Sequence, residues 1–226
     1  MKTYTKISAK ILFAALSLFS GLAAARAEDA DFKLPTGLYV AAGAGPDWIG
    51  DSKLTIFNSR VQSHWAPGWG GYAALGYRFP IGLRLELEGS GRDALNHTFN
   101  KGDPWYGTQW DTSAMVNVLY DISTGTRFTP YVGGGIGLSH LSWGNNFRAN
   151  LNNLPYIYDD SGSQFGWQVI VGLAYNITPK LALTTDFRYK GSDGYTFRSS
   201  GPSYTNITNF DYRTSDLFFG VRYSFD

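Results

Sequence analysis

The chain has 226 residues, no Cys, and 19 Lys and Arg against 18 Asp and Glu, so its formal net charge is +1. Without Cys it has no disulfide framework, no lipoprotein anchor and no thiolate metal site, and this charge balance is not that of a nucleic-acid-binding protein. Gly is frequent (27 residues) and 16% of the residues are aromatic, whereas only 16% are charged. This composition favours β-structure in contact with lipid.

The first 27 residues have the layout of a secretory signal peptide. Lysines at positions 2, 6 and 10 precede an apolar stretch at 11–22, and Ala25 and Ala27 supply the small residues of a cleavage site. The apolar stretch is shorter than the roughly 20 residues of a transmembrane helix, and no later segment is a long apolar run. We therefore predict a cleaved signal peptide at 1–27 and one mature domain at 28–226.

Eight segments of the predicted mature chain alternate apolar residues with small or polar residues at a period of two. A strand between lipid and a barrel interior requires this pattern. It is clearest at 83–88, where three leucines alternate with Arg84, Glu86 and Glu88, because a charge at every second position cannot face hydrocarbon. The predicted strands are 38–45, 69–79, 83–88, 110–120, 129–141, 165–175, 181–190 and 212–225.

The connections between these segments alternate strictly between long and short. Short turns at 80–82, 123–125 and 178–180 contain Pro, Gly, Ser or Thr. The long connections are expected at 46–68, 91–109, 142–163 and 191–211. This layout predicts an all-β, eight-stranded up-and-down antiparallel transmembrane barrel with short periplasmic turns and four long extracellular loops. A soluble lipocalin-type barrel is disfavoured because here the charges share a face with the glycines, which is the crowded, inward face.

Several short motifs lie along the mature chain: NVLYD at 117–121, TGTR at 124–127, FTPYVGGGIG at 128–137, GWQ at 166–168, GLAY at 172–175, DFRY at 186–189 and GVRYSF at 220–225. Together they resemble the small bacterial outer-membrane β-barrel family that includes the opacity-type proteins and the OmpA-like membrane domain. The resemblance implies an integral protein of the Gram-negative outer membrane. It would be surrounded by lipid and lipopolysaccharide and would need no cofactor.

The C-terminal strand resembles the signature that the barrel-assembly machinery of Gram-negative bacteria reads. Apolar and aromatic side chains alternate up to the penultimate residue, and Asp226 follows them. The resemblance therefore implies the assembly machinery as a partner. The residues of the signature are Leu217, Phe219, Val221, Tyr223 and Phe225.

Charged residues on the inward face predict an internal network of ion pairs. The lumen of an eight-stranded barrel has room only for side chains, and charges removed from water must be paired. We expect Arg84, Arg188 and Arg222 to pair with Glu86, Glu88 and Asp186. The alternative is a narrow, low-conductance, porin-like channel. The predicted network consists of Arg78, Arg84, Glu86, Glu88, Asp186, Arg188 and Arg222.

His140 and Ser142 would lie together on the outward face of one strand, near its exterior end. Outer-membrane lipid A deacylases of this barrel size use an outward His-x-Ser with an acid. A serine becomes a nucleophile only with a base in reach and a group that orients the base, and the sequence offers no distinctive acid. We therefore predict no catalytic residue, and the isolated His64 and His97 predict no metal site.

The predicted long loops are richer in aromatic residues than solvated loops need to be. Exposed Trp and Tyr are common anchors of recognition surfaces, although they also pack on one another or on lipid headgroups. We expect a non-enzymatic protein with a structural role in the envelope that contacts host or environmental ligands through its loops. A lipid A-modifying enzyme is the less favoured alternative. The loop aromatics are Trp48, Trp65, Trp105, Tyr106, Trp143, Tyr156 and Tyr158.

Overall fold

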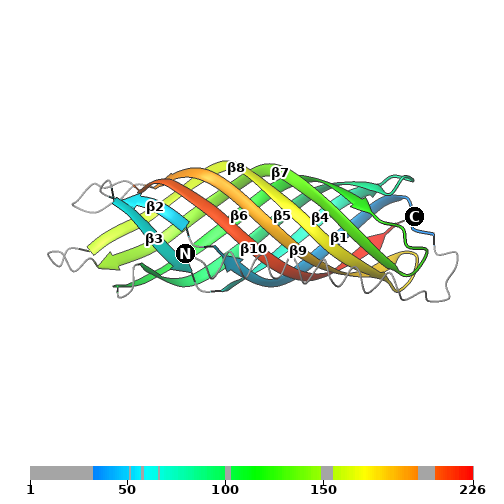
Figure 1. Ribbon diagram of the computed structural model, residues 1–226, viewed down its shortest axis with the longest axis horizontal. Helices are drawn as coiled ribbons and strands as arrows, with labels where there is room; N and C mark the ends of the chain where they lie inside the picture. Colours follow the sequence, from blue (N-terminus) through cyan, green and yellow to red (C-terminus); the bar gives the residue numbers. More distant parts are fainter. Residues whose placement is uncertain are drawn as a thin grey trace.

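The structure, a computed structural model, describes residues 33–225 apart from 51, 57–58, 66, 100–102, 149–154 and 198–206 (Figure 1). The predicted signal peptide at 1–27 lies outside the described residues and stays a prediction. The described ranges include no helix that is long and apolar enough to cross a membrane.

Strands make up most of the described chain. In chain order they are β1 (Gly37–Ile49), β2 (Ser52–Ile56), β3 (Ser59–Trp65), β4 (Gly68–Arg78), β5 (Leu83–Phe99), β6 (Asp103–Asp121), β7 (Phe128–Arg148), β8 (Pro155–Asn176), β9 (Leu181–Phe197) and β10 (Ile207–Ser224).

Eight long strands close into one antiparallel barrel. Each strand from β4 to β9 pairs with the next along the chain, and β1 pairs with both β4 and β10, which closes the ring. The other two, β2 and β3, form a hairpin whose outer edges pair with β10 and β5. The prediction of an eight-stranded antiparallel barrel is confirmed, and the hairpin is an addition that the sequence did not suggest.

The two ends of the barrel differ. The three short turns and the C-terminus lie at one end, which we call the turn end, and the β2–β3 hairpin lies toward the other, the far end (Figure 1). The turn between β4 and β5 is closed by a hydrogen bond from the Gly82 N–H to the Phe79 carbonyl, at 3.1 Å. Gly82 has φ of 84°, a conformation that glycine adopts without steric strain.

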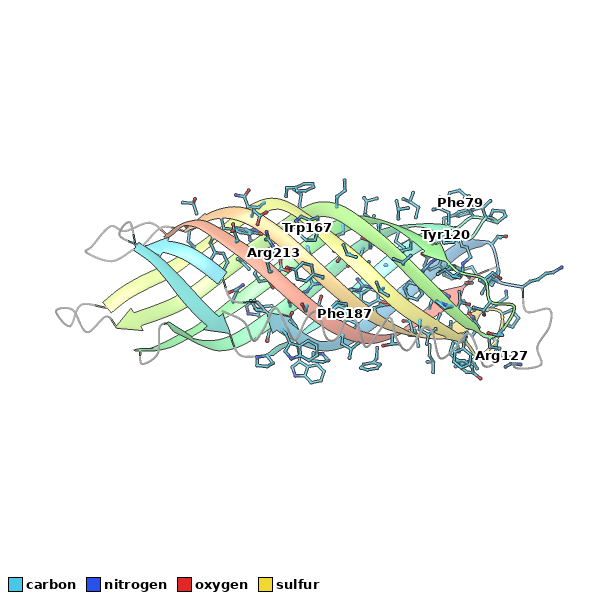
Figure 2. The ribbon with its side chains drawn as sticks, in the orientation of Figure 1. Phe79, Tyr120, Arg127, Trp167, Phe187 and Arg213 are labelled. Atoms are coloured by element: carbon cyan, nitrogen blue, oxygen red, sulfur yellow. The ribbon has the colours of Figure 1, made fainter. Side chains whose placement is uncertain are left out.

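Side chains alternate between the outside of the wall and its interior. Leu87 is 62% exposed, whereas the next residue, Glu88, is 1% exposed. Most of the exposed aromatic side chains lie in two bands on the outer face, with Trp69, Trp110 and Phe165 in one and Phe79, Tyr120 and Phe225 in the other. Figure 2 shows Phe79 and Tyr120 pointing away from the barrel near the turns. Trp110 and Tyr120 belong to opposite bands of β6, and ten residues at about 3.3 Å each and a tilt of about 40° span roughly 25 Å. This is the height of the hydrocarbon-facing band of a membrane barrel.

The strands continue well beyond the boundaries that the sequence predicted. The ranges 46–68, 91–109, 142–163 and 191–211, predicted as loops, are largely strand: β7 runs to Arg148 and β8 begins at Pro155. The physical reason is that the outer face no longer needs to be apolar past the aromatic band. The alternation of hydrophobicity therefore ends, although the ladder of backbone hydrogen bonds goes on.

Candidate functional site

The interior of the barrel holds charged side chains in three successive clusters. The turn-end cluster consists of Arg78, Arg84, Glu86, Asp121 and Arg222, each at most 4% exposed. Arg84 donates from Nη1 to Oε1 of Glu86 at 2.9 Å, and its Nε lies 3.0 Å from Oδ1 of Asp121. Arg78 forms a second ion pair with Asp121. Asp121 thus forms ion pairs with two arginines.

The middle cluster is centred on Arg188. Its Nη1 lies 2.7 Å from Oε2 of Glu88, and its Nη2 lies 3.0 Å from Oδ2 of Asp186. Two amides complete the surroundings of Glu88: Asn117 donates from Nδ2 at 2.7 Å, and Gln168 donates from Nε2 at 3.2 Å. Both Glu88 and Asp186 therefore have a guanidinium partner and further hydrogen bonds.

The far-end cluster contains Arg92, Lys190, Asp47, Asp111 and Asp216. Arg92 holds Asp216 with two nitrogens, since Nη2 lies 2.7 Å from Oδ2 and Nε lies 3.1 Å from Oδ1. It also lies 3.4 Å from Asp111, which forms an ion pair with Lys190. A two-nitrogen contact of this kind is strong and directional, so the guanidinium of Arg92 is fixed between two strands on opposite sides of the lumen.

Three lumen tyrosines connect these clusters to the wall. Each ring lies over a glycine directly opposite on the adjacent strand, where an added Cβ would overlap the ring. Each hydroxyl donates to a carboxylate: that of Tyr72 lies 2.9 Å from Oδ2 of Asp186, and the other two bond to Asp186 and to Glu86. The guanidinium carbon of Arg188 also lies 3.7 Å from the centre of the Tyr72 ring. The pairs are Tyr39 with Gly76, Tyr72 with Gly43 and Tyr131 with Gly172.

Little space remains between these side chains. A cavity of about 10 Å³ lies between the turn-end and middle clusters, which is about the volume needed for a single water molecule. Its lining includes Arg84, Glu86, Thr184, Asp186 and Arg222. The lumen of the described barrel is therefore filled largely by packed polar side chains.

A model of the outer membrane protein beta-barrel domain family matches residues 11–225 of the chain. The chain belongs to this family. It is 26% identical over 174 residues to the outer membrane protein PagN of Salmonella typhimurium, across 70% of this chain and 73% of PagN. An outer membrane protein of Gluconacetobacter diazotrophicus is 32% identical over 247 aligned positions; these cover 92% of this chain but only 63% of that protein, which is less than two thirds of its length.

Solved structures share the fold at low sequence identity. The outer membrane protein OprG from Pseudomonas aeruginosa has a TM-score of 0.58 and 13% identity, with 84% of this chain and 97% of OprG covered. The outer membrane protease OmpT from Escherichia coli has a TM-score of 0.51 and 11% identity, with 88% and 100% covered. These likenesses concern the fold alone.

The family places the chain in the outer membrane as an integral β-barrel. In such barrels the short turns face the periplasm and the longer connections face the exterior. The turn end of this outer-membrane barrel is therefore periplasmic, and the far end is extracellular.

All the side chains predicted for the lumen lie there, but the ion pairs differ from those expected. Arg84 and Arg188 pair with the predicted acids, whereas Arg222 forms no ion pair with Glu86, Glu88 or Asp186. Those carboxylates already accept bonds from Arg84 and Arg188. The predicted residues placed in the lumen are Arg78, Arg84, Glu86, Glu88, Asp186, Arg188 and Arg222.

Among the described side chains, five further charged residues of the lumen were missed. Asp47 and Arg92 fell in ranges predicted as loops, because the apolar alternation ends near them. The other three occupy the alternate positions that point inward on their strands, so the alternation alone was enough to predict them. They are Asp111, Asp121 and Asp216. Asp121 ends β6 at the periplasmic turn, where the prediction had the strand already complete.

His140 has a different hydroxyl partner from the one considered in the sequence. Its Nδ1 lies 2.9 Å from Oγ of Ser163 on β8, and both side chains are exposed on the outer face. Ser142 lies opposite Ser161 instead. Within the described residues, no group of three or more His, Asp or Glu is arranged to hold a metal ion.

The C-terminal residues lie on the outer face of β10, in register with β1 and β9. Val221 lies opposite Ala42 and Leu183, and the rings of Tyr223 and Phe225 are 5.5 Å apart. Recognition of this surface by the assembly machinery stays a prediction. The predicted residues on this face are Leu217, Phe219, Val221, Tyr223 and Phe225.

The aromatic residues predicted for loops lie on strands. Trp48 is half-buried on β1, with Ser215 of β10 opposite. The side chains of the other six lie outside the description, although their backbone belongs to β3, β6, β7 and β8. These six are Trp65, Trp105, Tyr106, Trp143, Tyr156 and Tyr158.

Proposed function

We propose that this outer-membrane barrel is a closed, non-enzymatic anchor that supports the envelope and carries a β-sheet extension for contact with molecules outside the cell. The observation that carries the proposal is the length of the strands beyond the outer aromatic band. The β7–β8 hairpin keeps its register as far as Arg148 and Pro155, whereas Phe165 still belongs to the band.

The extension is long enough to project from the membrane. From Phe165 to Pro155, β8 continues for ten residues, or roughly 25 Å at about 3.3 Å per residue and a tilt of about 40°. A paired strand has a pre-organised backbone, which lowers the entropy lost on binding. We expect the partners to be host or environmental surface ligands, which the extension meets first.

The packed lumen supports a structural role over conduction. An ion crossing the barrel would have to displace three clusters of paired charges, and removing one partner from a buried pair is strongly destabilising. The cavity found among these clusters has a volume of about 10 Å³, which is far smaller than a hydrated ion needs.

Two measurements test this proposal. In single-channel recordings, the refolded mature protein should give almost no current, and stable conductance steps would favour the porin-like alternative. In whole-cell adhesion assays, wild-type barrels should bind immobilised extracellular matrix protein or an abiotic surface more than a variant whose residues 146–157 are replaced by a two-residue turn. Equal adhesion, with equal amounts of both proteins at the surface, would contradict the contact role.

A third measurement addresses catalysis at His140. A nucleophilic serine would need His140 as a base and a third group to orient the imidazole, and the bond recorded for the His140 ring is to Ser163. Mass spectra of lipid A should be identical after incubation with the wild type, Ser163→Ala and Ser142→Ala. A modified lipid A that appears only with the wild type would identify an enzyme.

A further inference from the structure

Asp47 differs from the other buried carboxylates of the described lumen, because it forms no ion pair. It is 0% exposed and lies on β1 directly opposite Asp216 of β10. The hydroxyl of Thr214 donates to its Oδ1, whereas its Oδ2 has no N–H or O–H donor among the described residues. The other six buried carboxylates each pair with an arginine or a lysine.

Among the described lumen side chains, the charges balance except around Asp47. In the turn-end and middle clusters together, four arginines face four carboxylates. The far-end cluster has three carboxylates but two cations. Arg92 on β5 pairs with Asp216 and with Asp111 of β6. Lys190 on β9 pairs with Asp111. If all three carboxylates were ionised, one negative charge would remain uncompensated away from water, which is strongly destabilising.

The contact between Asp47 and Asp216 shows how this charge is avoided. The two carboxyl groups form a side-chain hydrogen bond. An ionised carboxylate only accepts hydrogen bonds, so a hydrogen bond between two carboxyl groups requires a proton on one of them. Asp216 accepts from Nε and Nη2 of Arg92, at 3.1 and 2.7 Å, and such charge-assisted bonds stabilise its ionised form. The proton therefore belongs on Asp47.

The other groups near Asp47 do not replace the proton. Tyr212 of β10 interacts electrostatically with Asp47, but its hydroxyl has no hydrogen-bond partner in the described part of the chain. Asp111 carries the same sign of charge and accepts from Ser139 at 2.6 Å. On its other side, Asp47 lies opposite Gly68 of β4, which has no side chain. The described carboxylates are not arranged to hold a metal ion.

We propose that Asp47 is protonated in the folded barrel and donates a hydrogen bond to Asp216, so that the pair carries a single negative charge. The far-end cluster then has two negative and two positive charges. The pair joins β1 to β10, the strands that close the ring, one residue beyond Pro46, which lies opposite Trp69 of the outer aromatic band. Loss of the proton at alkaline pH would place two like charges side by side and weaken the extracellular end of this seam.

The first test detects the proton directly. Infrared spectra of the mature protein, refolded in a detergent without carbonyl groups at neutral pH, are compared with those of Asp47→Asn. The wild type should show the carbonyl stretching band of a protonated carboxylic acid, and the variant should lack it. Absence of the band from the wild type, or its persistence at full strength in the variant, would overturn the proposal.

The second test measures stability against pH. An aspartate in an unfolded chain loses its proton near pH 3.9, so above this pH the folded wild type holds one proton more than the unfolded chain. Asp47→Asn takes up no such proton. The unfolding equilibrium constant of the wild type, divided by that of the variant, should therefore rise by about tenfold per pH unit above about pH 5, until Asp47 ionises. A ratio that does not change with pH would contradict the proposal.

A matched control is Glu86→Gln, which makes the same kind of change to an ion-paired carboxylate of the turn-end cluster. It should destabilise the barrel, because Arg84 loses a partner. The infrared band should nevertheless remain, and the ratio of unfolding constants should not rise with pH. If Glu86→Gln removed the band as Asp47→Asn does, the proton would not be located at Asp47 and the proposal would fail.

Discussion

The two faces of strand β5 lie in opposite environments, lipid on the outside and a polar lumen on the inside. Outward, Leu85 and Leu87 are 46% and 62% exposed, and in the membrane this exposure is contact with hydrocarbon. Inward, Glu86 and Glu88 are 4% and 1% exposed, and each is held by an arginine and by neutral hydrogen-bond donors. The comparison teaches that the lipid face depends only on the kind of side chain, whereas the lumen face depends on particular partners.

This difference predicts how the two faces respond to mutation. A lipid-facing position should tolerate any apolar residue and reject a charge according to its depth. A lumen position should reject even a well-packed apolar residue when a buried partner is left behind.

The largest effect is expected from Arg188→Leu. The substitution leaves both Glu88 and Asp186 without their guanidinium, and loss of one partner from a buried pair costs about 3 to 5 kcal/mol. The control is Arg213→Leu on the outer wall, where Arg213 pairs with the exposed Asp193 and the expected change is below about 1 kcal/mol. Urea unfolding followed by tryptophan fluorescence measures both, and equal midpoints would contradict the assignment of a polar core.

The next largest loss of stability is expected on the lipid face, and the same test locates the outer edge of the hydrocarbon band. Leu87→Lys places a charge near the middle of the hydrocarbon band and should lower the free energy of unfolding in lipid vesicles by about 2 to 4 kcal/mol. Ser161→Lys adds the same charge to the outer face of β8, beyond the band, and should change little. If both variants lost the same free energy of unfolding, the hydrocarbon would extend over Ser161. The β7–β8 extension would then project from the membrane by less than proposed.

The sequence predicted the membrane-spanning part of the wall well. There, lipid and lumen impose opposite requirements on successive residues, so inward and outward positions follow from parity alone, as at 83–88. Beyond the band, water replaces lipid outside and both faces accept polar residues. That is why β5 to Phe99 and β7 to Arg148 were mistaken for loops.

Partners in the lumen were harder to predict than positions. The alternation of side chains places Arg222 inside the barrel, but it does not show which strands face Arg222 across the lumen. Those partners depend on the register between strands and on the shear of the barrel. The contact between Arg92 on β5 and Asp216 on β10 is of this kind, because β5 and β10 do not pair with each other in the wall. The fit of Tyr131 over Gly172 likewise depends on exact register.

A smaller effect is expected where a lumen glycine gains a methyl group. Gly172→Ala places a Cβ inside the Tyr131 ring position, and such overpacking costs about 1 to 3 kcal/mol. Gly89→Ala is the matched control, since a Cβ there meets nothing within 4 Å on the outer face, and it should be neutral or slightly stabilising. The double variant Gly172→Ala with Tyr131→Ala should recover the part of the stability that the clash removes. Equal unfolding midpoints for Gly172→Ala and Gly89→Ala would count against the register of β7 and β8.

The smallest effect is expected from removing a tyrosine hydroxyl. The comparison is between a hydroxyl that forms neutral hydrogen bonds in the lumen and a hydroxyl on the outer wall. The hydroxyl of Tyr195 donates to the Ser139 carbonyl at 2.9 Å and accepts from Ser192 at 3.0 Å, so Tyr195→Phe should cost about 1 kcal/mol. Tyr223→Phe makes the identical change on the outer wall, where the side chain is 44% exposed, and should leave the unfolding midpoint unchanged. A larger loss from Tyr223→Phe than from Tyr195→Phe would mean that stability resides in the outer aromatic band rather than in the partners fixed inside the barrel.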